Sequence, residues 1–409
     1  MTSAAPSENS PQAIYGTLIT DGQRIDDGVL AVDGDRISYA GPAASFSPPE
    51  GAQKTVLSAG SFIFPGLIDL HTHGAAGGDF PGGQEDSARK AIDFLHSHGT
   101  TTLLASMVTA SEADLLRGIE LYVRLSEEGL IAGIHLEGPF LSEARCGAQD
   151  PAYLLAPDLE LTERLIDAGQ GKIVTMTYAP ELEGAAALIE LLTSHGITPS
   201  LGHTDSDAAT AAASLAQARE GLAATGFDGH PGRPTITHLF NGMPPMHHRS
   251  PGPVAACLRF ARAGKAAVEL VADNTHLDPQ TVLTVFELLG AENILLVSDS
   301  MAATGLSDGS YKLGPAAVTV NGGIATLDAT GSIAGGTSTL LQVVLRTAAA
   351  GVALESAVFS ATAAPARVLG LSDEVGGLRR GLRADAVVVS PEGELQSVMR
   401  AGKWLKISD

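Results

Sequence analysis

Six side chains with metal-binding chemistry recur at the ends of short apolar runs in this sequence. Each follows a stretch that predicts a β-strand, and together they are His71, His73, Glu137, His203, His238 and Asp299. Imidazole and carboxylate groups are the donors that hold Zn²⁺ or a similar divalent ion. Successive strand ends carrying such donors predict a shared metal centre, and the chemistry of that centre indicates a metal-dependent hydrolase.

The pair His71 and His73 stands in the segment GLIDLHTHG. Residues two apart in a strand point to the same face, so both rings are expected at the place where the strand ends. An isolated pair of this kind is as often a hydrogen-bonded structural pair. Here the apolar strand before it and the glycine-rich loop after it favour metal ligation.

Glu137 closes the run IAGIHLEGPF, where a buried carboxylate would face desolvation unless a cation neutralised it. His135 lies on the same face but deeper, and we interpret it as a hydrogen-bonded interior group rather than a ligand. Lysines are scarce and none ends a strand, so no carbamylated lysine can bridge two ions. Glu137 is the natural bridging candidate.

His203 in TPSLGHTD and His238 in TITHLFNGM follow the next strands, and their rings are expected beside Glu137. Asp299 in NILLVSDSM can bind the metal, act as the general base, or do both, and we favour a base with weak metal contact. Cys146 is interpreted as an ordinary loop residue, with a lid or redox-sensing role at the barrel mouth as the alternative.

Chargeable groups follow two of the ligands: His247, His248 and Arg249 in NGMPPMHHRSPG, and His276 in DNTH. In an acidic protein such groups predict a bound anion, although Arg249 taken alone is equally an ordinary surface arginine.

A serine-hydrolase pattern occurs at Gly305, Ser307 and Gly309. A nucleophile elbow needs a strand before the serine and a helix after it, whereas AATGLSDGSYKLG is typical of a loop on both sides. A nucleophilic role for Ser307 is therefore not favoured.

Apolar segments alternate with helical ones through most of the chain, which favours a (β/α)₈ barrel. Helices are expected at 85–97, 112–127, 185–194 and 205–220, with a last helical stretch at 339–368. The eight strands are expected at 67–70, 101–107, 131–136, 173–178, 198–201, 235–237, 267–272 and 294–297. Short β-rich pieces with turn dipeptides occupy both ends. We expect a barrel domain over 65–369 and one small β-domain made from 1–64 and 370–409.

The composition excludes several classes of function. A net charge of −21 and only 4% aromatic residues disfavour nucleic acid as a partner. Two cysteines provide no disulfide framework, which fits the cytoplasm. No apolar run reaches the roughly 18 to 20 residues that a membrane span requires, and no signal peptide is recognisable at the start.

The ordered motifs HTH, HLEGPF, GHTD, THLFNGMPP and LVSDS, with the closing GGLRRGLRADAVVV, carry a family resemblance. From about Gly28 to Trp404 the chain resembles the N-acetylglucosamine-6-phosphate deacetylases of the amidohydrolase superfamily. The resemblance implies a (β/α)₈ TIM-type barrel with a β-sandwich built from both termini. It also implies a homodimer whose partner subunit is a candidate contributor to the phosphate site.

The resemblance extends to individual positions. It implies metal binding by Glu137, His203 and His238, with His71 and His73 supplying a second site, so we expect one or two ions, zinc first among the candidates. Asp299 matches the catalytic base. The sugar phosphate is assigned to Asn241, the backbone of Gly242, Arg249 and His276.

Two departures from the family pattern stand out. Gln149 occupies the position where relatives usually carry a histidine that helps polarise the acetyl carbonyl, and an amide can donate a hydrogen bond but cannot become cationic. The family's Asp-Gly before the later histidine is here Asp273 and Asn274.

The implied reaction is hydrolysis of the acetamide of N-acetyl-D-glucosamine 6-phosphate, a step of amino-sugar catabolism or cell-wall recycling. The residues leave three further functions open: action on the galactosamine epimer, a cyclic-amide hydrolase of the dihydroorotase or hydantoinase kind, and a non-catalytic scaffold on the same barrel.

Overall fold

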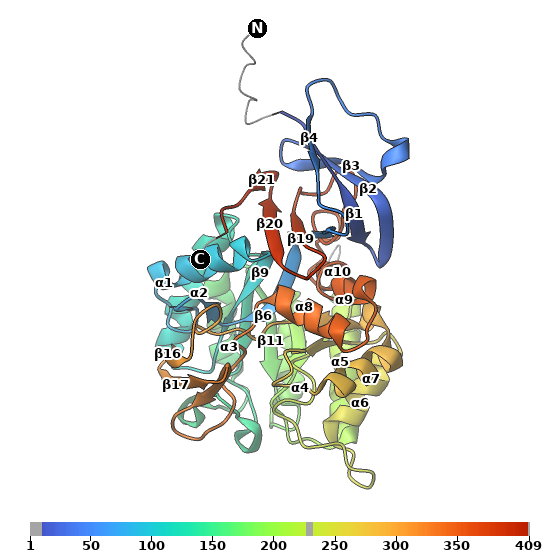
Figure 1. Ribbon diagram of the computed structural model, residues 1–409. Coiled ribbons are helices and arrows are strands. Elements are labelled where there is room, and N and C mark those ends of the chain that lie inside the picture. The colour runs from blue at the N-terminus through green and yellow to red at the C-terminus, as the bar shows by residue number, and fades with distance from the viewer. Residues whose placement is uncertain (1–9, 226–231, 408–409) are drawn as a thin grey trace.

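Both ends of the chain build one small β-domain. The computed structural model describes residues 10–225 and 232–407. Antiparallel pairing of β19 with β5 joins the C-terminal strands to the N-terminal ones, and Figure 1 shows them side by side. The eight strands of this branched sheet are β1 (Gln12–Thr20), β2 (Gln23–Asp33), β3 (Arg36–Pro42), β4 (Gln53–Val56), β5 (Phe62–Pro65), β19 (Ala386–Val389), β20 (Leu395–Arg400) and β21 (Lys403–Trp404).

Eight parallel strands form the barrel, as the alternating pattern predicts. Their order around the sheet follows the chain, and a parallel bridge between Thr72 and Ser300 closes the ring. The strands are β6 (Leu67–Thr72), β9 (Thr100–Met107), β10 (Gly133–Glu137), β11 (Ile173–Tyr178), β12 (Thr198–Leu201), β13 (Thr235–Ile236), β14 (Ala267–Leu270) and β15 (Ile294–Leu296).

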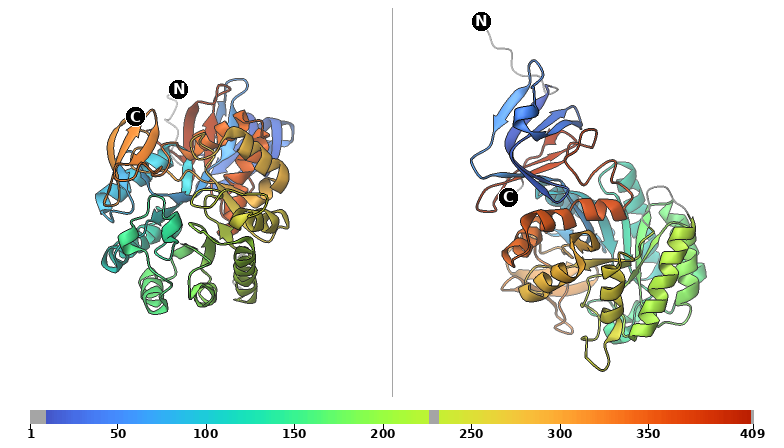
Figure 2. Two further views of the ribbon diagram at one scale, coloured as in Figure 1. Left: turned by 90° about the horizontal axis from the view of Figure 1, so that it is seen from below. Right: turned by 90° about the vertical axis from the view of Figure 1, so that its right-hand side faces the viewer.

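Helices surround these strands, with the β-domain at one side of the barrel (Figure 2). Three predicted helices have the expected bounds, at α1, α2 and α4. The ten helices in the described chain are α1 (Glu85–Ser97), α2 (Glu112–Glu127), α3 (Leu159–Gly169), α4 (Ala185–Ser194), α5 (Ala208–Thr225), α6 (Gly252–Arg262), α7 (Pro279–Leu289), α8 (Leu340–Ala349), α9 (Leu354–Ser360) and α10 (Ala363–Val368).

Two helix predictions need correction. The helix predicted over 205–220 begins at Ala208 instead, because the preceding Asp207 accepts a hydrogen bond from the backbone of Thr210 as a capping residue does. The stretch predicted over 339–368 is three helices rather than one. Gly351, with φ +108°, interrupts it after α8, and Thr362 separates α9 from α10.

The core lies between the strands and the surrounding helices. In α4, for example, Leu188, Ile189 and Leu192 are fully or almost fully buried against the outer face of the barrel. Their spacing of one and then three residues is that of a single helix face. Burial of each such side chain contributes about 1.5–3 kcal/mol relative to exposure, so this packing fixes the strands whose ends carry the candidate ligands.

A three-stranded antiparallel insert follows β15, and the sequence prediction missed it. It consists of β16 (Gly309–Leu313), β17 (Ala316–Asn321) and β18 (Ile324–Leu327). The glycine pair at 322–323, both with positive φ, forms the turn between β17 and β18. Apolar and polar residues alternate before and after that pair, and this alternation was the sequence signal for a hairpin. Because β16 follows Ser307 directly, no helix follows this serine, and the elbow geometry is absent.

Shorter elements complete the described chain. A two-stranded ribbon, β7 (Gly74–Ala75) with β8 (Gly78–Asp79), follows β6. Single 3₁₀ turns occur at η1 (Ala43–Ser45), η2 (Glu143–Arg145), η3 (Pro151–Tyr153) and η4 (Ala291–Asn293).

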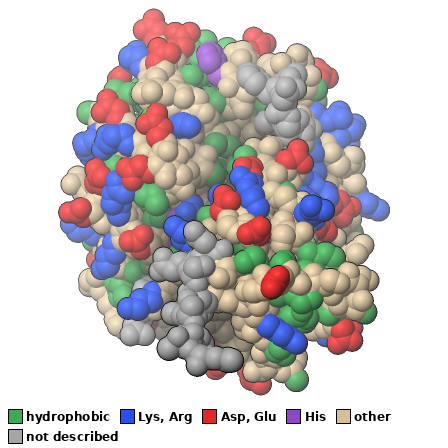
Figure 3. All heavy atoms as spheres, turned by 90° about the horizontal axis from the view of Figure 1, so that it is seen from above, with side chains coloured by type: hydrophobic (Ala, Val, Ile, Leu, Met, Phe, Trp, Pro, Cys, Tyr) green, Lys and Arg blue, Asp and Glu red, His purple; other side chains and the backbone are tan. Residues whose placement is uncertain are grey.

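One face of the molecule gives no support for a polyanionic partner. On the face shown in Figure 3, basic and acidic side chains are interspersed rather than gathered into one basic field. In the described parts of the chain, no helix has the length and apolar character needed to cross a bilayer.

A buried histidine outside the barrel mouth predicts a pH-dependent stability. His96 on α1 is 6% exposed, and its Nε2 has no hydrogen-bond partner in the described chain. Burial, reinforced by the nearby Arg400 and Arg383 guanidinium groups, lowers the pKa of His96 to about 3. In the unfolded chain the imidazole of His96 takes up a proton near pH 6.5, whereas in the folded chain it stays neutral. The folded state therefore loses stability as pH falls below that value.

We expect His96→Gln to weaken this pH dependence. Between pH 6 and pH 4, His96 should lower the free energy of unfolding of the wild type by at most about 1.4 kcal/mol for each pH unit, and the variant lacks this loss. The midpoints of thermal unfolding for the variant and the wild type should therefore converge, or cross, as pH falls. His195→Gln, on an exposed helix end, is the matched control. A constant gap between the His96 variant and the wild type would contradict this assignment.

Candidate active site

All six predicted donors lie at the carboxyl-terminal ends of barrel strands. They come from five strands, with β6 supplying two of them, and each lies within its strand or at most three residues beyond it. The donors are His71 and His73 at β6, Glu137 at β10, His203 after β12, His238 after β13 and Asp299 after β15. This rim is where barrel enzymes carry their catalytic groups.

Three of the donors adopt a left-handed backbone conformation. The φ angles are +46° at His203, +26° at His238 and +47° at Asp299. Residues other than glycine seldom occupy this region, and each instance costs of order 1–3 kcal/mol. Backbone hydrogen bonds hold these turns in place, from Ser142 N to His203 O at 3.0 Å and from Asp299 N to His71 O at 2.9 Å. Such stored strain is typical of functional positions.

The first group of donors, here called the glutamate set, consists of Glu137, His203 and His238. Oε1 of Glu137 lies 2.9 Å from Nε2 of His203 and 2.9 Å from Nε2 of His238. The two Nε2 atoms are 3.1 Å apart. Ligands about 2.0–2.1 Å from a tetrahedral zinc ion lie about 3.3 Å from one another. The three atoms therefore have the spacing of three corners of such a site.

The second group, the aspartate set, consists of His71, His73 and Asp299. The two Nε2 atoms are 3.1 Å apart, and Oδ1 of Asp299 lies 3.5 Å from that of His71 and 3.3 Å from that of His73. Oε2 of Glu137 also lies 3.6 Å and 3.2 Å from the same two nitrogens. Glu137 thus presents one oxygen to each set, as a bridging carboxylate does.

The other ring nitrogen of three histidines is already engaged. Nδ1 of His73 faces the carbonyl of Ser106 at 3.1 Å, and Nδ1 of His203 faces that of Arg145 at 2.7 Å. Nδ1 of His71 lies 3.1 Å from Oε2 of Glu269. Because a carbonyl oxygen only accepts, the proton of His73 and of His203 belongs on Nδ1 and the Nε2 lone pair faces the cavity, which is the tautomer that a metal ligand needs.

His135 is a hydrogen-bonded interior group, as predicted. Its Nδ1 lies 2.9 Å from the hydroxyl of Ser106 and its Nε2 lies 2.8 Å from that of Thr177. Both ring nitrogens are therefore hydrogen-bonded within the barrel.

Two buried carboxylates that support the donors were not predicted. Glu269 on β14 is 2% exposed, and its Oε2 accepts from the backbone of His238 as well as facing His71. Asp69 on β6 accepts from the backbone of His71 and from the hydroxyl of Ser298, and burial raises the pKa of Asp69 to about 6. Glu269 and Asp69 each stand inside an otherwise apolar strand. That position was the sequence signal by which these buried carboxylates could have been predicted.

The pKa shifts of the buried site residues indicate that this site favours positive charge. Burial alone would lower the pKa of His71 and of His73, but the surrounding carboxylates outweigh it. Glu137 and Asp299 raise the pKa of His71 well above its ordinary value and that of His73 to about 9. Burial would raise the pKa of Glu137 and of Asp299, yet the histidines hold both well below their usual range. The buried carboxylates therefore favour positive charge at this place.

The donor chemistry fits a divalent metal. Nitrogen and oxygen atoms from six residues, each at most 7% exposed, converge in two groups whose ligand atoms lie within 4.8 Å of one another. Buried imidazole and carboxylate groups at such spacing are the ligands of zinc and related ions. The barrel and this pair of donor sets define the class of protein, a metal-dependent hydrolase.

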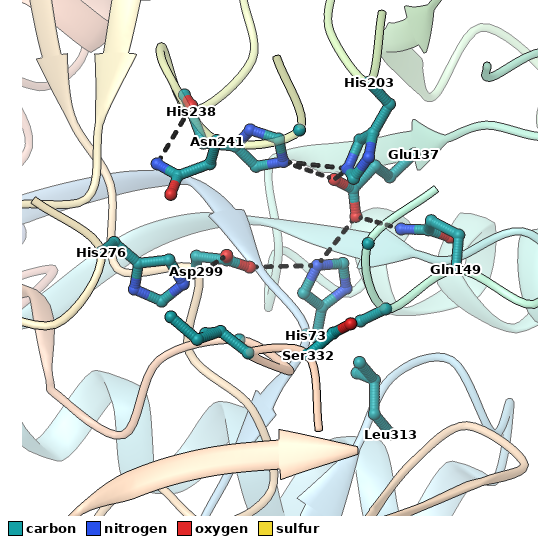
Figure 4. A pocket seen from close by; sticks show the side chains of 15 residues that line it. His73, Glu137, Gln149, His203, His238, Asn241, His276, Asp299, Leu313 and Ser332 are labelled. Carbon is teal, nitrogen blue, oxygen red and sulfur yellow. Dashed lines mark hydrogen bonds and ion pairs between the residues drawn. The ribbon is translucent and has the colours of Figure 1, made fainter. Parts of the chain in front are cut away.

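A cavity of about 230 Å³ opens over the donors. Figure 4 shows Asn241 and His276 at one side of it and Gln149 at the other. Gln149 is 5% exposed, and its Nε2 donates to Oε2 of Glu137 at 2.8 Å. The insert contributes Leu313 to the wall.

Four of the five residues predicted to hold the substrate lie together in the structure, and Arg249 does not lie with them. Gln149, Asn241, Gly242 and His276 line the cavity. Nδ1 of His276 lies 2.9 Å from Oδ2 of Asp273, which fixes the ring. Arg249 does not line this cavity and lies exposed on the loop after β13, with His247 and His248.

Cys146 does not line the cavity over the donors, although its neighbour Gly147 does. It is a free, partly buried thiol that lines a neighbouring cavity between the loop after β10 and the insert. The interpretation as an ordinary loop residue and the alternative of a lid or redox-sensing role both stay predictions.

Comparison with known proteins agrees with this geometry. A family model described as the amidohydrolase family matches residues 62–405. The N-acetylglucosamine-6-phosphate deacetylase of Bacillus subtilis is 31% identical over 399 residues, covering 92% of each chain. The N-acetylgalactosamine-6-phosphate deacetylase of Escherichia coli O157:H7 is 31% identical over 350 residues, covering 83% of this chain and 87% of the relative.

A solved structure matches almost the whole chain. The N-acetyl-D-glucosamine-6-phosphate deacetylase of Mycobacterium smegmatis, in a mutant form in complex with N-acetyl-D-glucosamine-6-phosphate, is 36% identical. It superposes with a TM-score of 0.88 and covers 97% of this chain and 99% of its own. The chain described here belongs to the amidohydrolase family and, within it, to the N-acetylglucosamine-6-phosphate deacetylases.

Proposed function

We propose that this protein hydrolyses the acetamide of N-acetyl-D-glucosamine 6-phosphate, releasing D-glucosamine 6-phosphate and acetate. One observation carries the proposal above the others: two buried donor sets share Glu137 beneath a cavity that Asp299 also lines. Relatives that match nearly the whole chain bear the name of this activity. The reaction belongs to amino-sugar catabolism or cell-wall recycling.

The cofactor is a divalent metal, and zinc is our proposal for its identity. The glutamate set would hold one ion and the aspartate set a second, with Glu137 between them. Such an ion, when bound, supplies Lewis acidity that makes water more acidic and polarises a carbonyl oxygen.

Asp299 is proposed as the general base. Its carboxylate is buried, lines the cavity and has no hydroxyl or amide donor of its own among the hydrogen bonds of the described chain. It would take a proton from the attacking water as the new C–O bond forms. When the C–N bond breaks, Asp299 would return that proton to the departing amine.

Gln149 is proposed to assist at the acetyl carbonyl. One N–H of its amide donates to Glu137. Among residues 10–225 and 232–407, no hydrogen-bond partner is seen for the second N–H of this group, and the side chain lines the cavity. This proton would stabilise the negative charge that develops on the carbonyl oxygen.

The phosphate is proposed to bind at the side of the cavity formed by Asn241, Gly242 and His276. Arg249 lies exposed nearby in sequence, so its contact with the phosphate requires movement of its loop or a second subunit at this face. A homodimer in which the partner completes the phosphate site is part of the proposal. Remote binding of this kind orients the reacting bond.

Three sugars test the proposed function in one assay. Acetate release should be fastest from N-acetylglucosamine 6-phosphate and much slower from its dephosphorylated form, because the phosphate contacts would be lost. The galactosamine epimer is the second candidate substrate, favoured by the similarity to the Escherichia coli enzyme. Comparable acetate release with and without the phosphate would contradict the proposal.

Arg249→Ala should chiefly damage use of the phosphorylated sugar. We expect kcat/KM for N-acetylglucosamine 6-phosphate to fall about 10- to 100-fold, the loss typical of one charge-assisted contact, mainly through KM. The residual rate with the dephosphorylated sugar should not change. Arg164→Ala, which removes an exposed pair with Glu112 on the barrel helices, is the matched control. An equal loss with both sugars would remove Arg249 from the phosphate site.

A cyclic-amide hydrolase and a non-catalytic scaffold have less support. Cyclic-amide hydrolases commonly use a bridging lysine, and no lysine lines the cavity in the described chain. A scaffold without activity is disfavoured because all six donors converge. The two cysteines are free thiols in the structure, and we propose a cytoplasmic location on that chemistry.

A further inference from the structure

The loop between β10 and the η3 turn contacts two ligands of the glutamate set at once. The carbonyl of Arg145 accepts from Nδ1 of His203 at 2.7 Å. Four residues later, Nε2 of Gln149 donates to Oε2 of Glu137 at 2.8 Å. One five-residue segment, 145–149, therefore holds a histidine and the carboxylate that must meet at the same ion.

The orientation of the Gln149 amide follows from its partners. Its Oε1 accepts from the backbone N–H of Thr109 at 2.7 Å while its Nε2 faces the Glu137 carboxylate. Rotating the amide by half a turn would set Nε2 against another N–H and Oε1 against a carboxylate oxygen. Both of those contacts are repulsive, so chemistry fixes the donor on Oε2 of Glu137.

The backbone of the segment is equally constrained. The backbone N–H of Gln149 donates to the carbonyl of Cys146 at 2.9 Å, closing a tight turn. Gly147, inside that turn, has φ +59°, and a Cβ built there would lie 3.3 Å from Cε1 of His203. Only glycine combines this conformation with such a close approach to the ring. The segment is thus shaped against His203 as well as against Glu137.

We propose that segment 145–149 is a clamp for the glutamate set and that Gln149 is its positioning residue. By holding Oε2, Gln149 keeps Oε1 directed at the Nε2 atoms of His203 and His238. This inference rests on the proposed metal site and adds a role separate from the carbonyl contact proposed above.

The test compares zinc affinity among variants of the whole protein, measured by competition with a chelator of known strength. Gln149→Leu keeps the volume and removes both hydrogen bonds, and we expect zinc affinity to fall about 10- to 100-fold. Gln149→His, which can still donate one N–H, should recover most of that loss. Asp150→Ala changes the adjacent η3 turn without touching Glu137, and should bind zinc as the wild type does.

A second readout separates positioning from catalysis. A carbonyl contact alone would lower kcat at saturating zinc and leave zinc affinity unchanged, and that result would overturn the clamp. If Gln149→Leu does not fold, Gln149→Asn, too short to reach Thr109 and Glu137 together, replaces it with the same expectation. A wild-type protein that binds zinc without releasing acetate would refute the proposed function yet leave this comparison valid.

Discussion

Replacing Asp299 with asparagine should lower kcat for acetate release by about a thousandfold or more while the fold persists. Asparagine has the size of aspartate, but its amide cannot accept the proton of water or return it to an amine. Positioned general bases contribute about 10²- to 10⁴-fold. Steady-state kinetics with N-acetylglucosamine 6-phosphate, together with circular dichroism of the variant, measure this directly.

Zinc binding and a surface variant control this experiment. The glutamate set does not include Asp299, so the variant should retain zinc there. Asp278→Asn changes an exposed aspartate that caps α7, and asparagine caps equally well, so its kcat should match the wild type. Near-full activity of Asp299→Asn would remove Asp299 as the base.

Glu137→Gln should abolish both zinc binding and turnover. Among the six donors, Glu137 alone has oxygens that face both sets, with Oε1 between His203 and His238 and Oε2 beside His73. A neutral amide is a poor ligand and would set an N–H against imidazole nitrogens. The loss of zinc affinity should exceed the roughly 10- to 100-fold that removal of an outer partner causes.

Zinc retained after dialysis, measured by elemental analysis, checks this second result. Glu143→Gln, an exposed glutamate on the η2 turn close in sequence, is the matched control and should retain zinc. Equal zinc content in Glu137→Gln and the wild type would show that the ion, if present, lies elsewhere.

The ligand rim was predictable from sequence because its signal is local. Each donor follows an apolar strand, and a barrel brings the carboxyl ends of its strands to one rim. His135 shows the limit of predicting ligands from strand ends. It lies on the same strand face as Glu137, and only its deeper position within the barrel distinguished it from a ligand. The structure places it against two hydroxyls, in agreement with the prediction.

The support around the ligands could not be predicted in the same way. Glu269 meets His71 across 198 positions of the chain, a contact that only the closed barrel creates. The insert β16–β18 carries no metal-binding side chain among the six donors, and its alternating residues around the glycine pair were a weak signal because its strands are half exposed. Arg249 matched an anion site by its residue type, yet its exposed position depends on a loop conformation that spacing does not encode.

Gln149 shows both what the sequence could predict and what it could not. Its departure from the family's histidine was visible in the sequence, and it suggested a weaker contact with the carbonyl. The contact with Glu137 was not visible, because it depends on the turn that Gly147 permits and on the backbone of Thr109.

Acetate release from N-acetylglucosamine 6-phosphate, before and after removal of metal, tests the central claim most directly. Protein stripped with a chelator should release no acetate above the rate of the Glu137→Gln variant, and added zinc should restore the rate in proportion to the ion bound. Full acetate release by protein shown to contain no metal would contradict the account.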